Sequence, residues 1–352
     1  MFTKQMKGNF PMRHSMNRRY HNWNYTSPAI YMITITQENR RLPLLGKVIV
    51  DKHSNIPEEI LAHCEPTRLG KIVWKTWKDM MNSFPGIRPL YFQLMEEHIH
   101  FILQVMQFLE RPLGKHIAAF KARCTQQFRQ LYNSPTGSLF ARGFQDTILF
   151  RKGQLPRMFN YLKDNPRRLA VKRLFPDLFR VTRYIPFDTG FLNGIGNCFL
   201  LQAPYFYQAQ VSRSIEVSSV DFQRKSDEMA EAVSQNAVVV SPCISPGEKE
   251  LAKIAFQHQA PLIALRNNDF PPLYKPSGAY FDACANGRLL LLAPPGLGYQ
   301  MGHRKLTRTE ACILNSIAQK ICGDFAADIS YHGLVPAELE KLVASSLQPP
   351  TH

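Results

Sequence analysis

Two histidines separated by one residue stand in a run of the chain that predicts a β-strand. The run LMEEHIHFILQV, residues 94–105, is mostly apolar. Because side chains alternate between the two faces of a strand, His98 and His100 are expected side by side on the more polar face, together with Glu96. Two adjacent imidazoles can hold two neighbouring coordination positions of one metal ion. The alternative, and the more frequent case for such a pair, is a purely structural role.

A tyrosine and an amide follow at the spacing of one helical turn. In the run YLKDNP, Tyr161 and Asn165 are four residues apart, so a helix would place both on one face. Together with the histidine pair they indicate a metal-assisted tyrosine nucleophile. The alternative is that Tyr161 belongs to the apolar stripe of a buried helix face, as a core tyrosine. In that case Asn165 simply ends the helix before Pro166.

The positive charge of the chain is concentrated in the half that holds these residues. The chain carries 43 Lys and Arg against 27 Asp and Glu. Residues 1–180 hold 29 of the basic and 12 of the acidic residues, whereas residues 181–352 hold the other 14 and 15. Only the first half is therefore expected to bind a polyanion, and a nucleic acid is the favoured one. A solvated basic surface without a partner, or an anionic membrane surface, is the alternative.

Composition limits the class of protein further. With 352 residues and 45% hydrophobic residues, the chain is expected to be globular and to form two domains. No apolar run approaches the roughly 18–20 residues of a membrane helix, so no membrane partner is expected. The seven cysteines are odd in number and scattered, without a CxxC pair. This pattern predicts a cytoplasmic protein and argues against a zinc ribbon or a disulfide framework.

The first half reads as a sheet with helices. Strands are expected at residues 29–36, 46–50 and 144–150 in addition to the histidine strand, with the strand at 46–50 antiparallel to the one at 29–36. Helices are expected at residues 67–81, 113–132 and 155–165, the second being the clearest amphipathic pattern of the chain. The order predicts an α+β fold with an antiparallel sheet and helices packed on one face.

The second half alternates short apolar strands with helices. Helices are expected at residues 221–235, 247–257, 278–285 and 307–322, and strands at residues 237–240, 261–266 and 288–293. This alternation predicts a parallel, Rossmann-like α/β sheet. Ser245 and Glu248 have the spacing of a capping box. The helix that they begin can bind a phosphate, although a capped helix without a ligand is the favoured interpretation.

These patterns predict five segments along the chain. Residues 1–28 form a basic tail, residues 29–175 the first domain, and residues 176–210 a linker of uncertain structure, in which residues 198–202 are strand-like. Residues 211–325 form the α/β domain and residues 326–352 a C-terminal tail.

The first half also resembles a known family in the order of its motifs. These motifs are the His-Ile-His strand, the basic helix after it, the segment GFQD at residues 143–146, and Tyr161-x-x-x-Asn165-Pro166. In this order and spacing they are similar to the REP-associated tyrosine transposases, which belong to the HUH single-strand nucleases that use one tyrosine. The similarity covers about residues 29–173. Where the family usually has Met-Pro-Asn before the first histidine, this chain has Met95-Glu96-Glu97.

The resemblance implies a chemistry and a set of residues. It implies that His98, His100 and the Asn165 carbonyl hold one divalent metal ion, Mg²⁺ or Mn²⁺, and that Tyr161 attacks single-stranded or hairpin DNA to give a 5′-phosphotyrosine. The metal ion or Glu96 could help the phenol to ionise, although a solvated carboxylate of the strand is the favoured interpretation of Glu96. The alternative is a non-catalytic DNA-binding protein that retains the fold, and a homodimer is compatible with either. The basic residues expected to contact DNA are Lys115, Lys121, Arg123, Arg151, Arg157, Arg167 and Arg168.

The second half carries a weaker resemblance. Residues 211–325 are similar to the Rossmann-like domain of DNA-processing proteins that load recombinase on single strands. The run VVVSPCISPGE contains no GxGxxG and no Walker loop. The expected role of this half is therefore to bind a partner or to guide a single strand, with no cofactor of its own.

Overall fold

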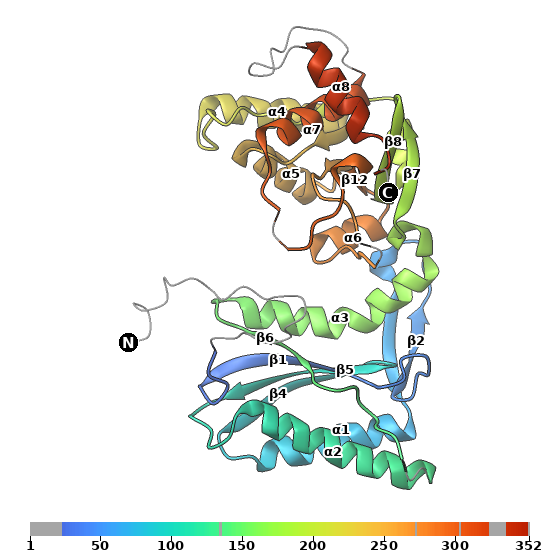
Figure 1. The fold of residues 1–352 in the computed structure, drawn as a ribbon, viewed down its shortest axis with the longest axis vertical. Coiled ribbons are helices and arrows are strands. Elements are labelled where there is room, and N and C mark those ends of the chain that lie inside the picture. Colours follow the sequence, from blue (N-terminus) through green and yellow to red (C-terminus); the bar gives the residue numbers. More distant parts are fainter. Residues whose placement is uncertain (1–22, 134–135, 272, 303, 324–335, 351–352) are drawn as a thin grey trace. The chain divides into compact units, whose positions relative to one another are not determined.

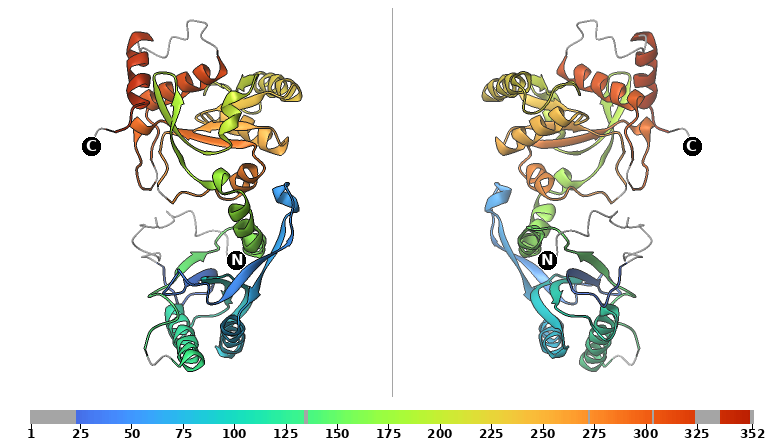
Figure 2. Two further views of the ribbon diagram at one scale, coloured as in Figure 1. Left: turned by 90° about the vertical axis from the view of Figure 1, so that its right-hand side faces the viewer. Right: turned by 90° about the vertical axis from the view of Figure 1, so that its left-hand side faces the viewer.

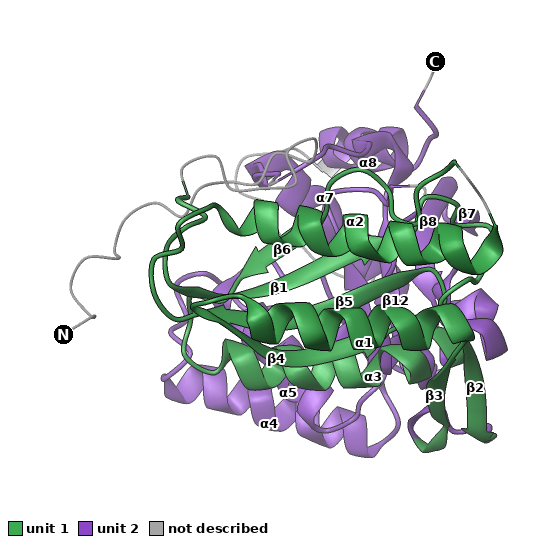
Figure 3. Ribbon diagram, turned by 90° about the horizontal axis from the view of Figure 1, so that it is seen from below, with its two compact units in different colours: residues 1–54, 59–170 green, residues 55–58, 171–352 purple. Residues whose placement is uncertain are grey.

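The structure is a computed structural model that describes residues 23–133, 136–271, 273–302, 304–323 and 336–350 (Figure 1). The chain forms two compact units, one of residues 1–54 and 59–170 and one of residues 55–58 and 171–352 (Figure 3). No helix within the described residues is long and apolar enough to cross a membrane.

The first unit is built on a four-stranded antiparallel sheet with the strand order β4-β5-β1-β6. Its strands are β1 (Ala29–Thr36), β4 (Ile87–Leu94), β5 (His98–Val105) and β6 (Gln145–Ile148). Helices α1 (Arg68–Ser83) and α2 (Leu113–Tyr132) lie side by side over one face (Figure 3). Helix α3 (Gln154–Leu174) lies on the other side of the sheet (Figure 1). The predicted α+β class with an antiparallel sheet is confirmed, and α3 adds a helix on the second face.

Strict alternation along the strands makes the core of this unit. Along β1, Tyr31, Ile33 and Ile35 are fully buried, whereas the residues between them are only half-buried. Phe101 of β5 shares this buried face and packs against Trp77 of α1 and Phe120 of α2, with ring centroids 6.0 and 6.1 Å apart. The face toward α1 and α2 is therefore apolar, and the face toward α3 is free to carry polar residues.

Two expectations for the first unit are wrong in detail, and one strand was not predicted. The strand predicted at residues 46–50 is β2 (Gly46–Lys52), but it pairs with β3 (Leu61–Pro66) as a separate two-stranded sheet and not with β1. Strand β3 was not expected from its sequence. The helix expected to end at residue 165 continues as α3 through Pro166 to Leu174. Pro166 removes one helical N–H and crowds the carbonyl one turn before it, and burial of Pro166 and Ala170 holds the next turns in place.

The second unit holds a six-stranded mixed sheet with the order β7-β8-β12-β11-β10-β9. Strands β9 (Phe206–Gln208), β10 (Val238–Ser241), β11 (Leu262–Leu265) and β12 (Leu289–Ala293) are parallel, and β8 (Gly190–Gly196) and β7 (Thr182–Phe187) add antiparallel strands at one edge. The sheet lies between two groups of helices (Figure 2). One group holds α4 (Val220–Ser234) and α5 (Pro246–Gln257), and the other holds α7 (Arg308–Cys322) and α8 (Pro336–Ser346).

The predicted helices and strands of the α/β half are confirmed, with α6 (Ala279–Ala285) as the shortest helix. Two segments differ from the expectation. The strand-like residues 198–202 form a 3-10 helix, and the rest of the expected linker supplies β7, β8 and β9 to the sheet. The expected C-terminal tail contains α8, whose Leu339 and Val343 are buried in the core of this unit.

Residues 1–22 of the expected basic tail lie outside the described residues. The last part of that segment belongs to the folded unit. Tyr25 is buried and donates a hydrogen bond from its hydroxyl to Asp146 Oδ2 at 3.0 Å, and Trp23 packs edge-on against Phe150.

Candidate functional site

The two histidines begin β5 and face α3. In the register of the sheet, His100 lies opposite Thr34 of β1 and His98 opposite Thr36, on the face that alternates with the buried residues of β1. The two imidazole rings lie edge to face, with centroids 4.7 Å apart. The predicted side-by-side arrangement of the pair on one strand face is therefore present in the structure.

A threonine orients the second histidine. Thr34 Oγ1 lies 2.8 Å from His100 Nδ1 and 3.5 Å from Met32 Sδ. The tautomer with its hydrogen on Nδ1 would donate to the Thr34 hydroxyl and leave the lone pair of Nε2 for a metal ion. Burial, together with the neighbouring His98, lowers the pKa of His100 to about 3. The ring is thus held neutral, in the form that binds a metal ion.

The two imidazoles can supply part of the coordination of a divalent metal ion. No group of three or more His, Cys, Asp or Glu side chains is placed to hold a metal ion within the described parts of the chain. Among these side chains, His98 and His100 would therefore supply two nitrogen ligands. The Thr34 hydroxyl has the role of the outer partner that fixes the orientation of a ligating histidine.

The histidines are part of a polar row that crosses the sheet. Gln145 of β6 lies opposite Thr34, Thr34 lies opposite His100, and His100 lies opposite Gln93 of β4. All four side chains point to the same face because paired residues of neighbouring strands do so. Sequence reasoning missed Thr34, Gln93 and Gln145. The alternation of β1, in which Thr34 and Thr36 fall between buried residues, was the signal that marked this face as polar.

Helix α3 packs on this face through one aromatic contact. Phe159 lies against Tyr91 of β4, with ring centroids 5.3 Å apart, and Tyr91 shares the histidine face because it lies opposite Ile102. Tyr161 follows Phe159 by two residues, so it points about 200° away around the helix. Its side chain is 40% exposed, so the core-tyrosine alternative is wrong. Asn165 lies one turn after Tyr161 on the same side of α3 and is half-buried.

The Arg168 side chain lies beside the ring of Tyr161. The guanidinium carbon of Arg168 lies 5.6 Å from the centre of the Tyr161 ring. Arg168 is buried and also pairs with Asp164, with Nη1 3.7 Å from Oδ2. Arg167 holds the same carboxylate through two hydrogen bonds of 2.5 and 3.0 Å. Asp164 thus anchors both arginines within one turn of the helix, and Arg168 places a positive charge beside the phenol.

Glu96 is not the solvated strand carboxylate that the sequence predicted. It lies in the turn between β4 and β5, is buried, and accepts a hydrogen bond from the Val48 backbone N–H at 2.9 Å. The Glu96 carbonyl also accepts from the Leu45 N–H at 3.1 Å. The residue therefore ties the turn before the histidines to the start of β2 instead of facing the site.

The seven basic residues expected to contact DNA lie in two groups. Arg157, Arg167 and Arg168 are on α3, and Arg151 lies just before it, whereas Lys115, Lys121 and Arg123 are on α2. The two helices lie on opposite sides of the sheet (Figure 1). The α3 group lies on the side of the sheet that carries the histidines (Figure 1). Among these residues Lys115, Arg123, Arg151 and Arg157 are exposed.

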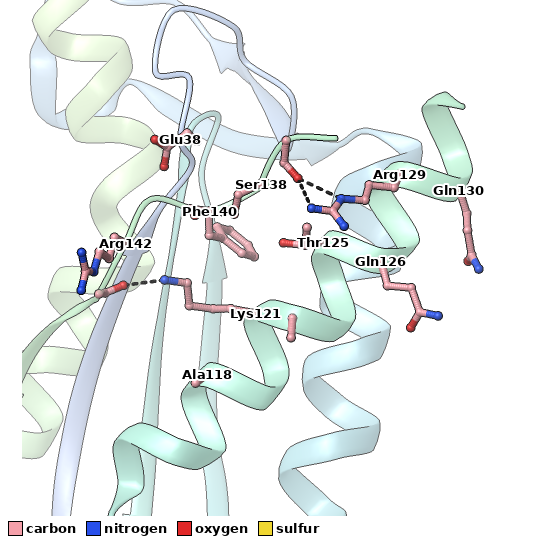
Figure 4. Close-up of a pocket in the computed structure, with 13 residues that line it drawn as sticks. Glu38, Ala118, Lys121, Thr125, Gln126, Arg129, Gln130, Ser138, Phe140 and Arg142 are labelled. Atoms are coloured by element: carbon pink, nitrogen blue, oxygen red, sulfur yellow. Dashed lines mark hydrogen bonds between the residues drawn. The ribbon is translucent and has the colours of Figure 1, made fainter. Parts of the chain in front are cut away.

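An open groove of about 910 Å³ lies beside α2, where the chain returns toward β6 (Figure 4). Lys121 donates from Nζ to the carbonyl of Ala141 at 2.5 Å and to that of Gly143 at 2.7 Å. Arg129 donates two hydrogen bonds to the Gly137 carbonyl at 2.8 and 2.9 Å. Lys121 and Arg129 therefore fasten the returning chain to α2.

Comparison with known proteins gives distant similarities. No family model matches the chain. A protein of Haemophilus influenzae, described as uncharacterized, is 22% identical over 191 residues, which cover 49% of this chain and 98% of that protein. A solved structure, described as a REP-associated tyrosine transposase bound to a REP hairpin, is similar over 43% of this chain and 74% of its own. The TM-score is 0.31 and the identity 14%, and a similarity this distant assigns no role to any residue.

Proposed function

We propose that the first unit cleaves and rejoins single-stranded DNA, with Tyr161 as the nucleophile and His98, His100 and the Asn165 carbonyl as ligands of one divalent ion, Mg²⁺ or Mn²⁺. One observation carries the proposal. The histidine pair lies on the sheet face that α3 covers, and α3 carries an exposed tyrosine beside an arginine. The excess of basic residues in the same half of the chain supports a nucleic acid as the substrate.

The chemistry is a phosphoryl transfer. The Tyr161 phenolic oxygen attacks phosphorus and forms the new P–O bond, the bond from phosphorus to the 3′ oxygen breaks, and that oxygen leaves as a 3′-hydroxyl after it takes a proton. The products are a 5′-phosphotyrosine and a free 3′ end. Because the phosphodiester is conserved in the covalent bond, a second 3′-hydroxyl can reverse the step and join strands.

Different residues of the site have different roles in this reaction. An unperturbed phenol has a pKa of about 10, so it needs help to lose its proton. The Arg168 guanidinium beside the ring can contact the scissile phosphate. The Thr34 hydroxyl engages His100 Nδ1, so Nε2 is the ring nitrogen that would bind the metal ion. A divalent ion bound by the histidines supplies Lewis-acid stabilisation of the charge that develops on the phosphate.

The decisive experiment is the isolation of a covalent protein–DNA adduct. The full-length protein is incubated with single-stranded hairpin DNA in the presence of Mn²⁺ or of a chelator, and the adduct is separated under denaturing conditions and mapped by proteolysis. We expect a metal-dependent adduct at Tyr161. The double variant His98→Ala, His100→Ala should lose the metal dependence and the cleavage together. Cleavage at the wild-type rate by this variant would show that the pair is structural.

A DNA-binding protein without catalysis is the second candidate. It is favoured by the orientation of Tyr161, which points away from the side of α3 that contacts the sheet through Phe159. This candidate predicts that hairpin DNA binds with an affinity that is independent of Mn²⁺ and that no adduct forms. The same incubation, followed by a binding measurement, separates the two functions.

A further inference from the structure

The carboxyl ends of the parallel strands in the second unit open into a cavity that the proposed DNA cleavage does not use. Strands β10 and β11 end at Ser241 and Leu265, and residues that follow them, Cys243 and Arg266 among others, line a cavity of about 620 Å³. In open parallel sheets, ligands bind in the crevice outside these strand ends. The volume lies within the range of roughly 300–1,000 Å³ that small-molecule sites occupy.

The lining of the cavity is basic. It includes Arg213, Lys249, Arg266 and Arg304, and no aspartate or glutamate is among the described residues that line it. Arg304 is neutralised, because its guanidinium pairs with Glu310. The other three basic residues leave a net positive lining, which attracts an anion.

Arg266 is pre-oriented and has a donor without an acceptor. Its guanidinium carbon lies 5.3 Å from the centre of the Phe270 ring and 4.9 Å from that of Tyr274. Its Nη1 is buried and makes no hydrogen bond. Nη1 is shielded from solvent, so a ligand in the cavity would meet the remaining part of this half-buried side chain. A phosphate is well suited to this contact, because a planar guanidinium binds phosphate through parallel hydrogen bonds.

The N-terminus of α5, which also borders the cavity, is already occupied. Glu248 Oε2 accepts from the backbone N–H groups of Ile244 and Ser245 at 2.6 and 3.2 Å, and Ser245 Oγ accepts from the Glu248 N–H. The predicted capping box is thus confirmed. An anion in the cavity must therefore be held by side chains and not by the helix terminus. Burial raises the pKa of Cys243 to about 11, so its thiol stays protonated and adds no negative charge.

The remaining wall of the cavity is apolar and aromatic. Ile244, Leu306 and Leu314 line it together with Tyr280, whose ring stacks on Phe256 with centroids 5.3 Å apart. A basic region and an apolar, aromatic region in one cavity match a ligand that carries a phosphate at one end and a flat ring at the other.

We infer that this cavity binds a nucleoside monophosphate, with the phosphate held by Arg266, Lys249 and Arg213 and the base against the apolar wall. The site is distinct in residues and in ligand from the DNA site of the first unit. A mononucleotide of this kind is a product of nucleic-acid hydrolysis, so a nuclease-type reaction would supply it.

The inference is tested by calorimetric titration of the full-length protein with the four deoxynucleoside 5′-monophosphates, the matching nucleosides and inorganic phosphate. We expect one monophosphate to bind with 1:1 stoichiometry and more tightly than its nucleoside or phosphate alone. Arg266→Gln should weaken this binding by about tenfold, as expected for the loss of a charge-assisted hydrogen bond. The control Arg224→Gln removes an exposed arginine of α4 that does not line the cavity, and it should leave binding unchanged.

A second variant guards against a fold defect, because Arg266 also packs on two rings. Lys249 is exposed, so Lys249→Gln should fold normally and weaken binding by about threefold. Absence of binding by all four monophosphates at millimolar concentration, or equal binding by Lys249→Gln, Arg266→Gln and wild type, would overturn the inference. So would binding of a single-stranded oligonucleotide that depends on Arg266 without any binding of monophosphates. Adduct formation at Tyr161 should be the same in every variant, which separates this site from the proposed function.

Discussion

At the scale of single residues, the phenol of Tyr161 and the hydroxyl of Thr34 carry the proposed chemistry. Tyr161 combines exposure with a neighbouring guanidinium. Thr34 contacts Nδ1 of His100 through one hydrogen bond. Each of these hydroxyls can be removed by a substitution that keeps the shape of the side chain, which makes the roles separable.

Tyr161→Phe is expected to abolish the covalent adduct and to leave the affinity for hairpin DNA within about twofold, because only the nucleophilic oxygen is lost. Gel analysis of the adduct and a binding titration measure the two effects. Tyr132→Phe, at an exposed tyrosine that ends α2, is the matched control and should form the adduct normally. An adduct that persists in Tyr161→Phe and disappears in Tyr132→Phe would show that Tyr132, and not Tyr161, is the nucleophile.

Thr34→Val is expected to weaken metal binding by about 10–100-fold, the effect of losing the outer partner of a ligating histidine. The quantity measured is the Mn²⁺ concentration that gives half-maximal binding, followed by the electron paramagnetic resonance signal of free Mn²⁺. Thr36→Val changes the neighbouring threonine of the same face and serves as the control. Equal Mn²⁺ affinities in the two variants and the wild type would remove Thr34 from the site.

At the scale of the elements, the turn between β4 and β5 decides where the histidine strand begins. Glu96 in this turn is bonded to the Val48 N–H of β2, so the carboxylate serves the fold. Helix α1 also packs closely against the residue before β2. A Cβ added to Gly70 at the start of α1 would lie 2.0 Å from the Leu45 carbonyl oxygen. Helix α1, the β2 strand and the histidine turn are therefore joined at one point.

Glu96→Gln is expected to retain cleavage activity and stability, because an amide oxygen can accept the same hydrogen bond. Glu96→Ala should reduce the free energy of unfolding by about 1–3 kcal/mol, the cost of a buried N–H without an acceptor. Denaturant unfolding followed by circular dichroism measures both. Loss of cleavage in a stable Glu96→Gln protein would instead assign the carboxylate a role in ionising the tyrosine.

The placement of α2 and α3 on opposite sides of the sheet gives a matched pair of arginine variants. Arg157→Gln on α3 is expected to weaken the binding of single-stranded DNA and to reduce the slope of log K against log salt by about 0.7, the value for one phosphate contact. Arg123→Gln on α2 is expected to change neither, since its arginine is equally exposed but lies on the far side of the sheet. A larger loss of affinity for single-stranded DNA in Arg123→Gln than in Arg157→Gln would show that the DNA binds on the α2 side of the sheet.

At the scale of the whole molecule, the charge is divided between two units with separate cores. A fragment of residues 175–352 keeps the complete mixed sheet and α8. We expect it to fold and to bind single-stranded DNA with a much shallower salt dependence than the full chain, because the basic excess lies in residues 1–180. Salt titrations of the two proteins compare the slopes. Equal slopes would assign the DNA affinity to the basic cavity of the second unit.

The sequence by itself determined the elements whose pattern repeats over neighbouring residues. The helix predicted at residues 113–132 is α2 at the same residues, and the alternation around His98 and His100 placed both on one face. Such periodicity is local, because adjacent side chains alone decide which face of an element is apolar.

Only the tertiary structure decided how distant segments meet. The partner of β2, the continuation of α3 past Pro166 and the bond between Glu96 and Val48 depend on packing between segments far apart in the chain. The cavity of the second unit likewise gathers Arg213 and Arg266 from separate loops. Local propensity is weak against the free energy of burial and of long-range hydrogen bonds, so these contacts override it and are absent from any short-range pattern.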